Sequence, residues 1–234
     1  MEKWNNRILI AAAAFALVGL VFCSGAERAL NVLGRTLHLA QRKGCVVIDA
    51  GHGGNDPGKV SANGTQEKDI NLEIALLVKQ YLESQDVAVT LTRSSDDDLA
   101  GTESGSRKEK DMRKRIEIID GTGADLAVSI HQNSYPSEKV KGAQVFYYGE
   151  SAEGKQLAET LQQELIDTLD PANRRTAKSN NSYYLLKKTQ TPIAIVECGF
   201  LTNPEEEKKL LDADYRDRAA WAVAKGILEY LTAK

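Results

Sequence analysis

The sequence has few cysteines and no excess of charge of either sign. Its 234 residues include three cysteines, Cys23, Cys45 and Cys198, which are too few and too scattered for a disulfide framework or a cysteine-rich zinc module. There are 30 lysines and arginines against 33 aspartates and glutamates, a formal net charge of −3, so no electrostatic argument favours a nucleic-acid partner. Any metal ion must use ligands other than cysteine.

Unusual composition and internal repeats are also missing. Hydrophobic residues make up 42% of the chain and charged residues 27%, which excludes general disorder, a collagen-like chain and a protein with many membrane spans. The length favours one domain with one hydrophobic core.

The N-terminus carries the only long apolar run. Lys3 and Arg7 precede this run, which extends over 16 residues from Ile8 to Cys23 and is followed by the small residues Ser24-Gly25-Ala26. This pattern predicts export, with residues 1–26 as a cleaved signal peptide or as an N-terminal membrane anchor. The run is long for a signal peptide yet shorter than the roughly 20 residues that span a bilayer, so both alternatives stay open. Residues 27–43 are predicted to be a linker, and residues 44–234 to lie outside the cytoplasm, in the cell envelope.

Predicted strands and helices alternate through residues 44–234. Apolar and β-branched runs predict strands at 45–49, 87–92, 126–130, 143–148 and 192–196, and helical periodicity predicts helices at 67–84, 111–121, 154–169 and after residues 204 and 214. This order predicts a single α/β domain with a mostly parallel, doubly wound sheet, helices on both faces and room for one antiparallel or edge strand. The polar segment 94–110 is interpreted as a surface connection, with a lid over a substrate as the alternative.

Reactive side chains follow three of the predicted strands. His52 lies in the glycine-rich turn after the first strand, His131 follows strand 126–130, and Glu197 follows strand 192–196. Glu67 begins the helix after the glycine-rich turn. Because ligands collect at the carboxyl ends of parallel strands, these four side chains are expected to meet. His52, Glu67 and His131 form a His₂Glu set of the kind that holds one catalytic Zn²⁺, and Glu197 remains as a base.

Other interpretations of these residues exist. Each histidine could have a purely structural role, and Glu67 could only complement the helix dipole. The segment GHGGNDPG could cradle a phosphate, but it lacks both the G-x-G-x-x-G pattern and a G-K-[ST] ending. The joint placement of the four residues, with Glu197 after an apolar run where an unpaired carboxylate is costly, favours the metal site.

Five separated segments carry a family resemblance. In chain order, VVIDAGHGG, EKDINL, LTR, ADLAVSIHQNS and IVECGFLTNPEE resemble the signature segments of the zinc-dependent N-acetylmuramoyl-L-alanine amidases of the Amidase_3 family. The resemblance extends from about Val46 to Leu231. GAQVFY and the stretch from YLLKK to EEKKLL are most similar to the spore-cortex members of that family.

The resemblance implies an activity and a set of roles. It implies hydrolysis of the amide bond between N-acetylmuramic acid and L-alanine in peptidoglycan stem peptides, in spore-cortex maturation with muramic-lactam formation. It also implies a location in the cell envelope or in the forespore intermembrane space. His52, Glu67 and His131 match the zinc ligands of the family, and Glu197 matches its catalytic glutamate. Ala50, Ser134 and Cys198 depart from the usual residues without removing a ligand. The short span between Tyr148 and GFLTN leaves little room for the inserted helix that blocks the cleft in some members, so an open cleft is expected.

Several points stay open in the sequence. Asn133 is the best candidate for a contact with the substrate amide, the alternative being a hydrogen bond within its own turn. A zinc peptidase acting on cell-wall peptides and a non-catalytic wall-binding domain are the competing functions, and an accessory protein is an open question. Cys198 is interpreted as a small buried side chain, not as a nucleophile. A Cys45–Cys198 disulfide would require their strands to be neighbours.

Overall fold

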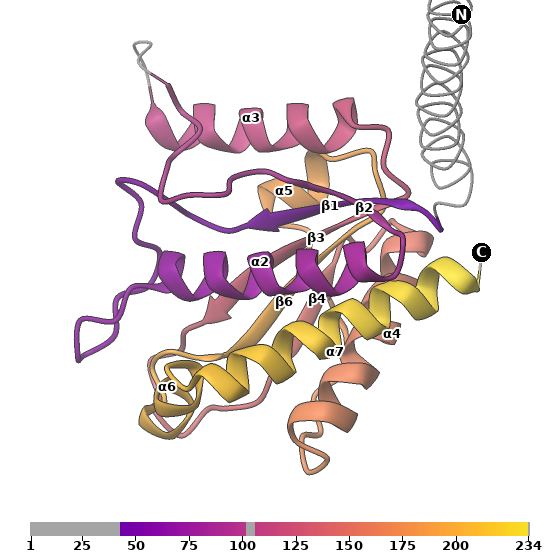
Figure 1. Ribbon diagram of the computed structural model, residues 1–234. Coiled ribbons are helices and arrows are strands. Elements are labelled where there is room, and N and C mark those ends of the chain that lie inside the picture. Colours follow the sequence, from indigo (N-terminus) through magenta and orange to yellow (C-terminus); the bar gives the residue numbers. More distant parts are fainter. Residues whose placement is uncertain (1–42, 102–105, 234) are drawn as a thin grey trace, which may run out of the picture. The chain divides into compact units, whose positions relative to one another are not determined.

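The computed structural model describes residues 43–101 and 106–233 (Figure 1). Its strands are β1 (Cys45–Ala50), β2 (Ala88–Leu91), β3 (Leu126–Asn133), β4 (Gln144–Tyr147), β5 (Lys178–Ser179) and β6 (Ile193–Phe200). Its helices are α2 (Glu67–Ser84), α3 (Arg107–Gly121), α4 (Ala152–Leu169), α5 (Tyr184–Lys188), α6 (Pro204–Leu210) and α7 (Ala213–Thr232). The predicted signal or anchor (1–26) and all but residue 43 of the predicted linker lie outside the described residues. None of the described helices is long and apolar enough to cross a membrane.

The six strands form one sheet in the order β2-β1-β3-β6-β4-β5. β1 pairs in parallel with β2 and β3, and β3 pairs in parallel with β6. β4 pairs antiparallel with β6 and parallel with the edge strand β5. The central strands β1, β3 and β6 are buried on both faces, which explains their continuous apolar sequences. The predicted mostly parallel sheet is confirmed, but two strands, β4 and β5, run opposite to the other four, where one antiparallel or edge strand was expected. The carboxyl ends of β1, β3 and β6 lie side by side.

Helices cover both faces of the sheet, as predicted (Figure 1). Alternate residues of β1 enter different cores. Val46 and Ile48 pack in a large core that includes residues of α2, α4 and α7, whereas Val47 packs in a smaller core with Ile119 of α3 and Leu185 of α5. The smaller core therefore lies under α3 and α5, two helices that also contribute residues to the cleft beside the predicted site.

Element boundaries differ from the prediction at polar ends. α3 begins at Arg107, so residues 107–110 are helical and not part of the predicted polar connection. The side chain of Ser106 accepts a hydrogen bond from the Glu109 N–H, and this cap starts the helix within a charged stretch. β3 and β6 continue through His131 and Glu197, which pair in register instead of following their strands. β5 and α5 were not predicted.

The topology excludes one sequence-based hypothesis. Cys45 begins β1 and Cys198 lies in β6, and β3 stands between these two strands. The hypothesis of a Cys45–Cys198 disulfide is therefore wrong, because it required neighbouring strands.

Candidate active site

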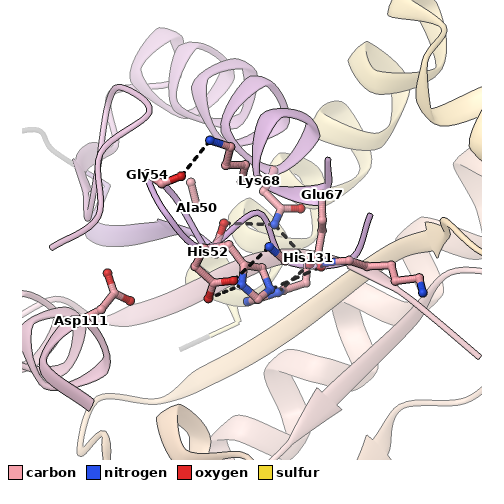
Figure 2. Close-up of polar contacts among 12 residues, drawn as sticks. Ala50, His52, Gly54, Glu67, Lys68, Asp111 and His131 are labelled. Carbon is pink, nitrogen blue, oxygen red and sulfur yellow. Dashed lines mark hydrogen bonds and ion pairs between the residues drawn. The ribbon is translucent and has the colours of Figure 1, made fainter. Parts of the chain in front are cut away.

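The three predicted ligands converge at the carboxyl ends of the central strands (Figure 2). His52 follows β1, Glu67 is the first residue of α2, and His131 lies near the end of β3. One ligand atom from each of the three side chains lies within 4.8 Å of the others. Two imidazole nitrogens and one carboxylate oxygen are a donor set that suits Zn²⁺. This is a candidate metal site built from three segments that are distant in the sequence.

The carboxylate of Glu67 lies between the two imidazoles. Its Oε1 is 3.0 Å from His131 Nδ1, and its Oε2 is 3.3 Å from His52 Nε2. Backbone N–H groups of Gln132 and Lys59 donate to the same two oxygens at 3.1 Å and 2.8 Å. Burial alone raises the pKa of Glu67, but the hydrogen bonds and positive charges of the two histidines bring it well below its usual range. Glu67 is therefore held as a fixed carboxylate.

Asp56 orients His52 from the side away from Glu67. His52 Nδ1 and Asp56 Oδ2 are 2.9 Å apart, so Nε2 faces the other candidate ligands. A carboxylate on the second ring nitrogen is the usual outer partner of a metal-binding histidine. Burial lowers the pKa of His52, but Glu67 and Asp56 outweigh this effect and raise it to about 9.

Glycine is required where the backbone approaches the candidate ligands. A Cβ on Gly51 would lie 2.2 Å from Cε1 of His131, and a Cβ on Gly58 would lie 2.5 Å from Oε2 of Glu67. Gly58 also has φ of +65°, and His52 itself has φ of 60°, in the left-handed region. A non-glycine residue in that region costs free energy that the surrounding structure must offset, a feature common at functional sites.

Two buried arginines offset that cost by binding three consecutive carbonyls. Arg93 donates to the Ala50 and Gly51 oxygens at 2.9 Å and 3.0 Å. Arg115 donates to the Ala50 and His52 oxygens at 2.8 Å and 2.6 Å. Their side chains are 4% and 2% exposed. Charge-assisted hydrogen bonds of this kind fix the path of the chain through His52.

Asp49 neutralises one of these arginines inside the fold. Its Oδ1 lies 2.5 Å from Arg115 Nη1, and the hydroxyls of Thr92 and Ser129 donate to its carboxylate. Burial raises the pKa of Asp49, yet Arg115 and the two hydroxyls lower it to about 2. Sequence reasoning missed this network. The available signal was an aspartate within an apolar strand, which needs a buried partner.

Glu197 lies beside the candidate ligands, and one of its two carboxylate oxygens is left without a partner among the described residues. It is 7% exposed, and it pairs in register with His131 on the neighbouring strand. Its Oε2 is buried and has no hydrogen-bond partner among the described residues. Burial and the negative charge of Glu67 raise the pKa of Glu197 to about 7, although the two histidines oppose the shift. A carboxyl group with a pKa near neutrality suits general-base chemistry.

Asn133 and Cys198 have different surroundings. Asn133 lines the same cleft, and its Oδ1 accepts a hydrogen bond from the Ser134 N–H at 2.8 Å. Cys198 packs in the large core, on the opposite face of the sheet from Glu197, and burial raises the pKa of its thiol to about 12. The interpretation of Cys198 as a small buried side chain is confirmed.

A cleft of about 730 Å³ gives access to these residues. Glu197 and the three candidate ligands line it, between the first turns of α3 and the start of α5. Besides the predicted helix α4, the span from Tyr148 to Gly199 contains only one helix, α5, which is 5 residues long. The predicted open cleft agrees with this geometry.

Comparison with known proteins identifies the family. The Amidase_3 family model, described as N-acetylmuramoyl-L-alanine amidase, matches residues 46–229. The chain belongs to this family and is an N-acetylmuramoyl-L-alanine amidase.

Individual relatives agree with this assignment. The germination-specific N-acetylmuramoyl-L-alanine amidase of Bacillus subtilis (strain 168) is 43% identical over 192 residues, which cover 81% of this chain and 80% of the relative. The amidase AmiA of Escherichia coli (strain K12) is 30% identical, covering 80% of this chain and 76% of AmiA. The CwlD amidase from Clostridioides difficile, solved in complex with the GerS lipoprotein, has a TM-score of 0.79 and 38% identity, covering 82% of this chain and 100% of that chain.

Proposed function

We propose that this amidase is zinc-dependent and that His52, Glu67 and His131 hold one Zn²⁺ per chain. The observation that carries the proposal is the convergence of these three donors beside a buried glutamate with a free oxygen. The glycines at positions 51 and 58, which leave room for His131 and Glu67, support it as well. Three protein ligands leave the open position that a catalytic zinc site needs.

The substrate bond is the amide between the lactyl group of N-acetylmuramic acid and L-alanine of the stem peptide. Zn²⁺ at the three ligands would supply Lewis-acid polarisation of the carbonyl oxygen and acidify the attacking water. Glu197 accepts the proton of that water and transfers it to the departing amine of L-alanine. Asn133 contacts the amide of the substrate with the part of its side chain that Ser134 does not engage.

The relatives support a narrower biological role. The germination-specific amidase and the CwlD structure both favour action on the spore cortex, in the maturation that forms muramic lactam. The complex of CwlD with a lipoprotein supports an accessory protein for this chain as well. Residues 1–26 export the enzyme or anchor it in the membrane, residues 27–43 link this segment to the catalytic domain 44–234, and the substrate lies in the cell envelope.

One assay tests the reaction against its competitors. The purified protein is incubated with isolated peptidoglycan, and the products are analysed by mass spectrometry and by labelling of new amines. We expect stem peptides with a free L-alanine amine and intact glycan chains. Release of a C-terminal amino acid, or a new amine within the stem peptide, would indicate a zinc peptidase. Binding to the wall without any product would indicate a non-catalytic domain.

A further inference from the structure

The cleft has two walls of different chemistry. On one side, the first turns of α3 present Arg107, Lys108 and Met112. On the other side, the start of α5 presents Tyr183, Tyr184 and Leu185. The candidate ligands and Glu197 lie between these two walls. A substrate that crosses the cleft therefore meets a cationic surface at one end and an aromatic surface at the other.

The acidic groups of the α3 wall already have partners. Asp98 is 2.5 Å from Arg107, and Asp111 is 2.7 Å from Arg115. Asp56 is engaged by His52, as described above. Lys108 is exposed, and in the part of the chain that the structure describes it forms no hydrogen bond or close ion pair, although its charge interacts electrostatically with Asp56. Its ammonium group is thus the cation of this wall that can bind an anionic ligand without breaking a hydrogen bond or a close ion pair.

The aromatic wall is anchored on the sheet close to Glu197. The ring of Tyr183 packs edge to face against Phe146, with centroids 5.6 Å apart. Phe146 pairs with Ile195, which lies two residues before Glu197 and on the same face of β6. Tyr184 is 47% exposed at the mouth of the cleft. Rigid tyrosines that offer an apolar ring and a polar hydroxyl suit a sugar, which has both apolar faces and hydroxyl groups.

We propose that the substrate lies across the cleft in one orientation, with the sugar against Tyr183 and Tyr184 and the stem peptide along α3, where Lys108 binds a stem-peptide carboxylate. This inference rests on the proposed function. The scissile amide has the sugar on its acyl side and the peptide on its amine side, so the two walls match the two halves of the substrate. The nearest free carboxylate of the peptide is the α-carboxylate of the second residue, a glutamate that is linked through its side chain.

Two synthetic substrates test the carboxylate subsite. Both are N-acetylmuramoyl tripeptides, one with the free α-carboxylate at the second residue and the other with an amide there. For Lys108→Gln we expect KM to rise about 3- to 10-fold on the free carboxylate, the range for one charge-assisted contact near the surface, and to stay unchanged on the amide. Lys108→Arg should keep the wild-type preference. An equal rise of KM on both substrates would overturn the subsite.

Matched variants separate the subsite from general effects of charge. Lys114 lies on the same helix, pairs with Glu117 at 3.0 Å and does not line this cleft. Lys114→Gln should leave KM unchanged on both substrates, and a rise as large as that of Lys108→Gln would contradict the proposal. Tyr184→Ala should raise KM by the same factor on both substrates, whereas an effect confined to the free carboxylate would reverse the orientation. Failure of the wild type to cleave either substrate would refute the proposed function itself.

Discussion

Glu197 is the residue on which the proposed chemistry depends most directly. Its replacement by glutamine keeps the shape of the side chain and removes its basicity. We therefore expect Glu197→Gln to lower kcat by about 10²–10⁴-fold, the usual contribution of a general base. Metal content, measured by elemental analysis, should match that of the wild type. Loss of the metal in this variant would instead identify Glu197 as a fourth ligand.

His52 should make metal binding dependent on pH. Its pKa is about 9 next to Glu67 and Asp56, so at neutral pH a metal ion must displace a proton from the imidazole. Because the protonated fraction increases as pH falls below 9, the apparent affinity should weaken about tenfold for each unit between pH 8 and pH 6. The apparent affinity for zinc is measured at each pH by competition with a chelator. The His52→Ala, His131→Ala double variant is the control, and stoichiometric zinc in that variant would refute the ligand assignment.

Single residues also show where sequence reasoning stops. The convergence of the four candidate residues is predictable, because three of them stand at the ends of apolar runs that meet at one edge of a parallel sheet and Glu67 begins the helix that follows the first of these runs. The roles of Arg93 and Arg115 are not predictable in this way. Arginine is usually exposed, and its burial depends on carbonyl groups whose direction is fixed only by the folded loop. Asp49 indicates that a partner exists but not which residue supplies it.

At the scale of elements, the segment between β1 and α2 offers a matched pair of glycines. Gly58 and Gly64 have φ of +65° and +86°, but only at Gly58 would a Cβ approach Glu67, since nothing lies within 4 Å at Gly64. Alanine at either position should cost about 1 kcal/mol of unfolding free energy from backbone strain. Only Gly58→Ala should also weaken zinc affinity, measured with a chelator. Equal affinities in the two variants would show that Glu67 tolerates displacement.

The stabilisation that the Arg115–Asp49 ion pair provides between α3 and the sheet should be lost at low pH. The pKa of Asp49 is about 2 in the folded protein against 3.8 in the unfolded chain, so its contribution is complete above pH 4 and is lost as pH falls through 2. At neutral pH, Asp49→Asn should lower the unfolding free energy by about 3–5 kcal/mol, because it leaves a buried arginine unpaired. Between pH 5 and pH 3 this deficit should shrink by about 1 kcal/mol in urea titrations. A constant deficit would contradict the assignment.

Elements were predictable in proportion to their length and apolarity. β1, β3 and β6 have apolar runs that only a buried strand explains, whereas β5 comprises 2 residues and α5 comprises 5. Elements this short form because neighbours hold them, so no local pattern marks them. The first turn of α3 was missed because its arginine and lysine residues do not face the core, and the cap at Ser106 starts the helix instead.

At the scale of the whole molecule, the candidate metal site brings together segments of the chain that are distant in the sequence. The three candidate ligands come from the loop after β1 (His52), from α2 (Glu67) and from β3 (His131). A bound ion would therefore connect these three elements. An ion that binds only the folded state stabilises it by about 2.7 kcal/mol at 100 times its Kd. The enzyme and its metal are therefore expected to be one cooperative unit.

The burial of Cys198 allows this coupling between metal binding and folding to be measured as a rate of thiol alkylation. Its thiol has no exposed surface and a pKa near 12, so alkylating reagents reach it only when β6 separates from its neighbours. The rate at which the peptide containing Cys198 becomes alkylated, measured by mass spectrometry, then reports how often β6 separates from its neighbours. No introduced probe is needed. Zinc should lower the alkylation rate of Cys198 in the wild type by about 100-fold at 100 times its Kd, and should leave that rate unchanged in the double histidine variant.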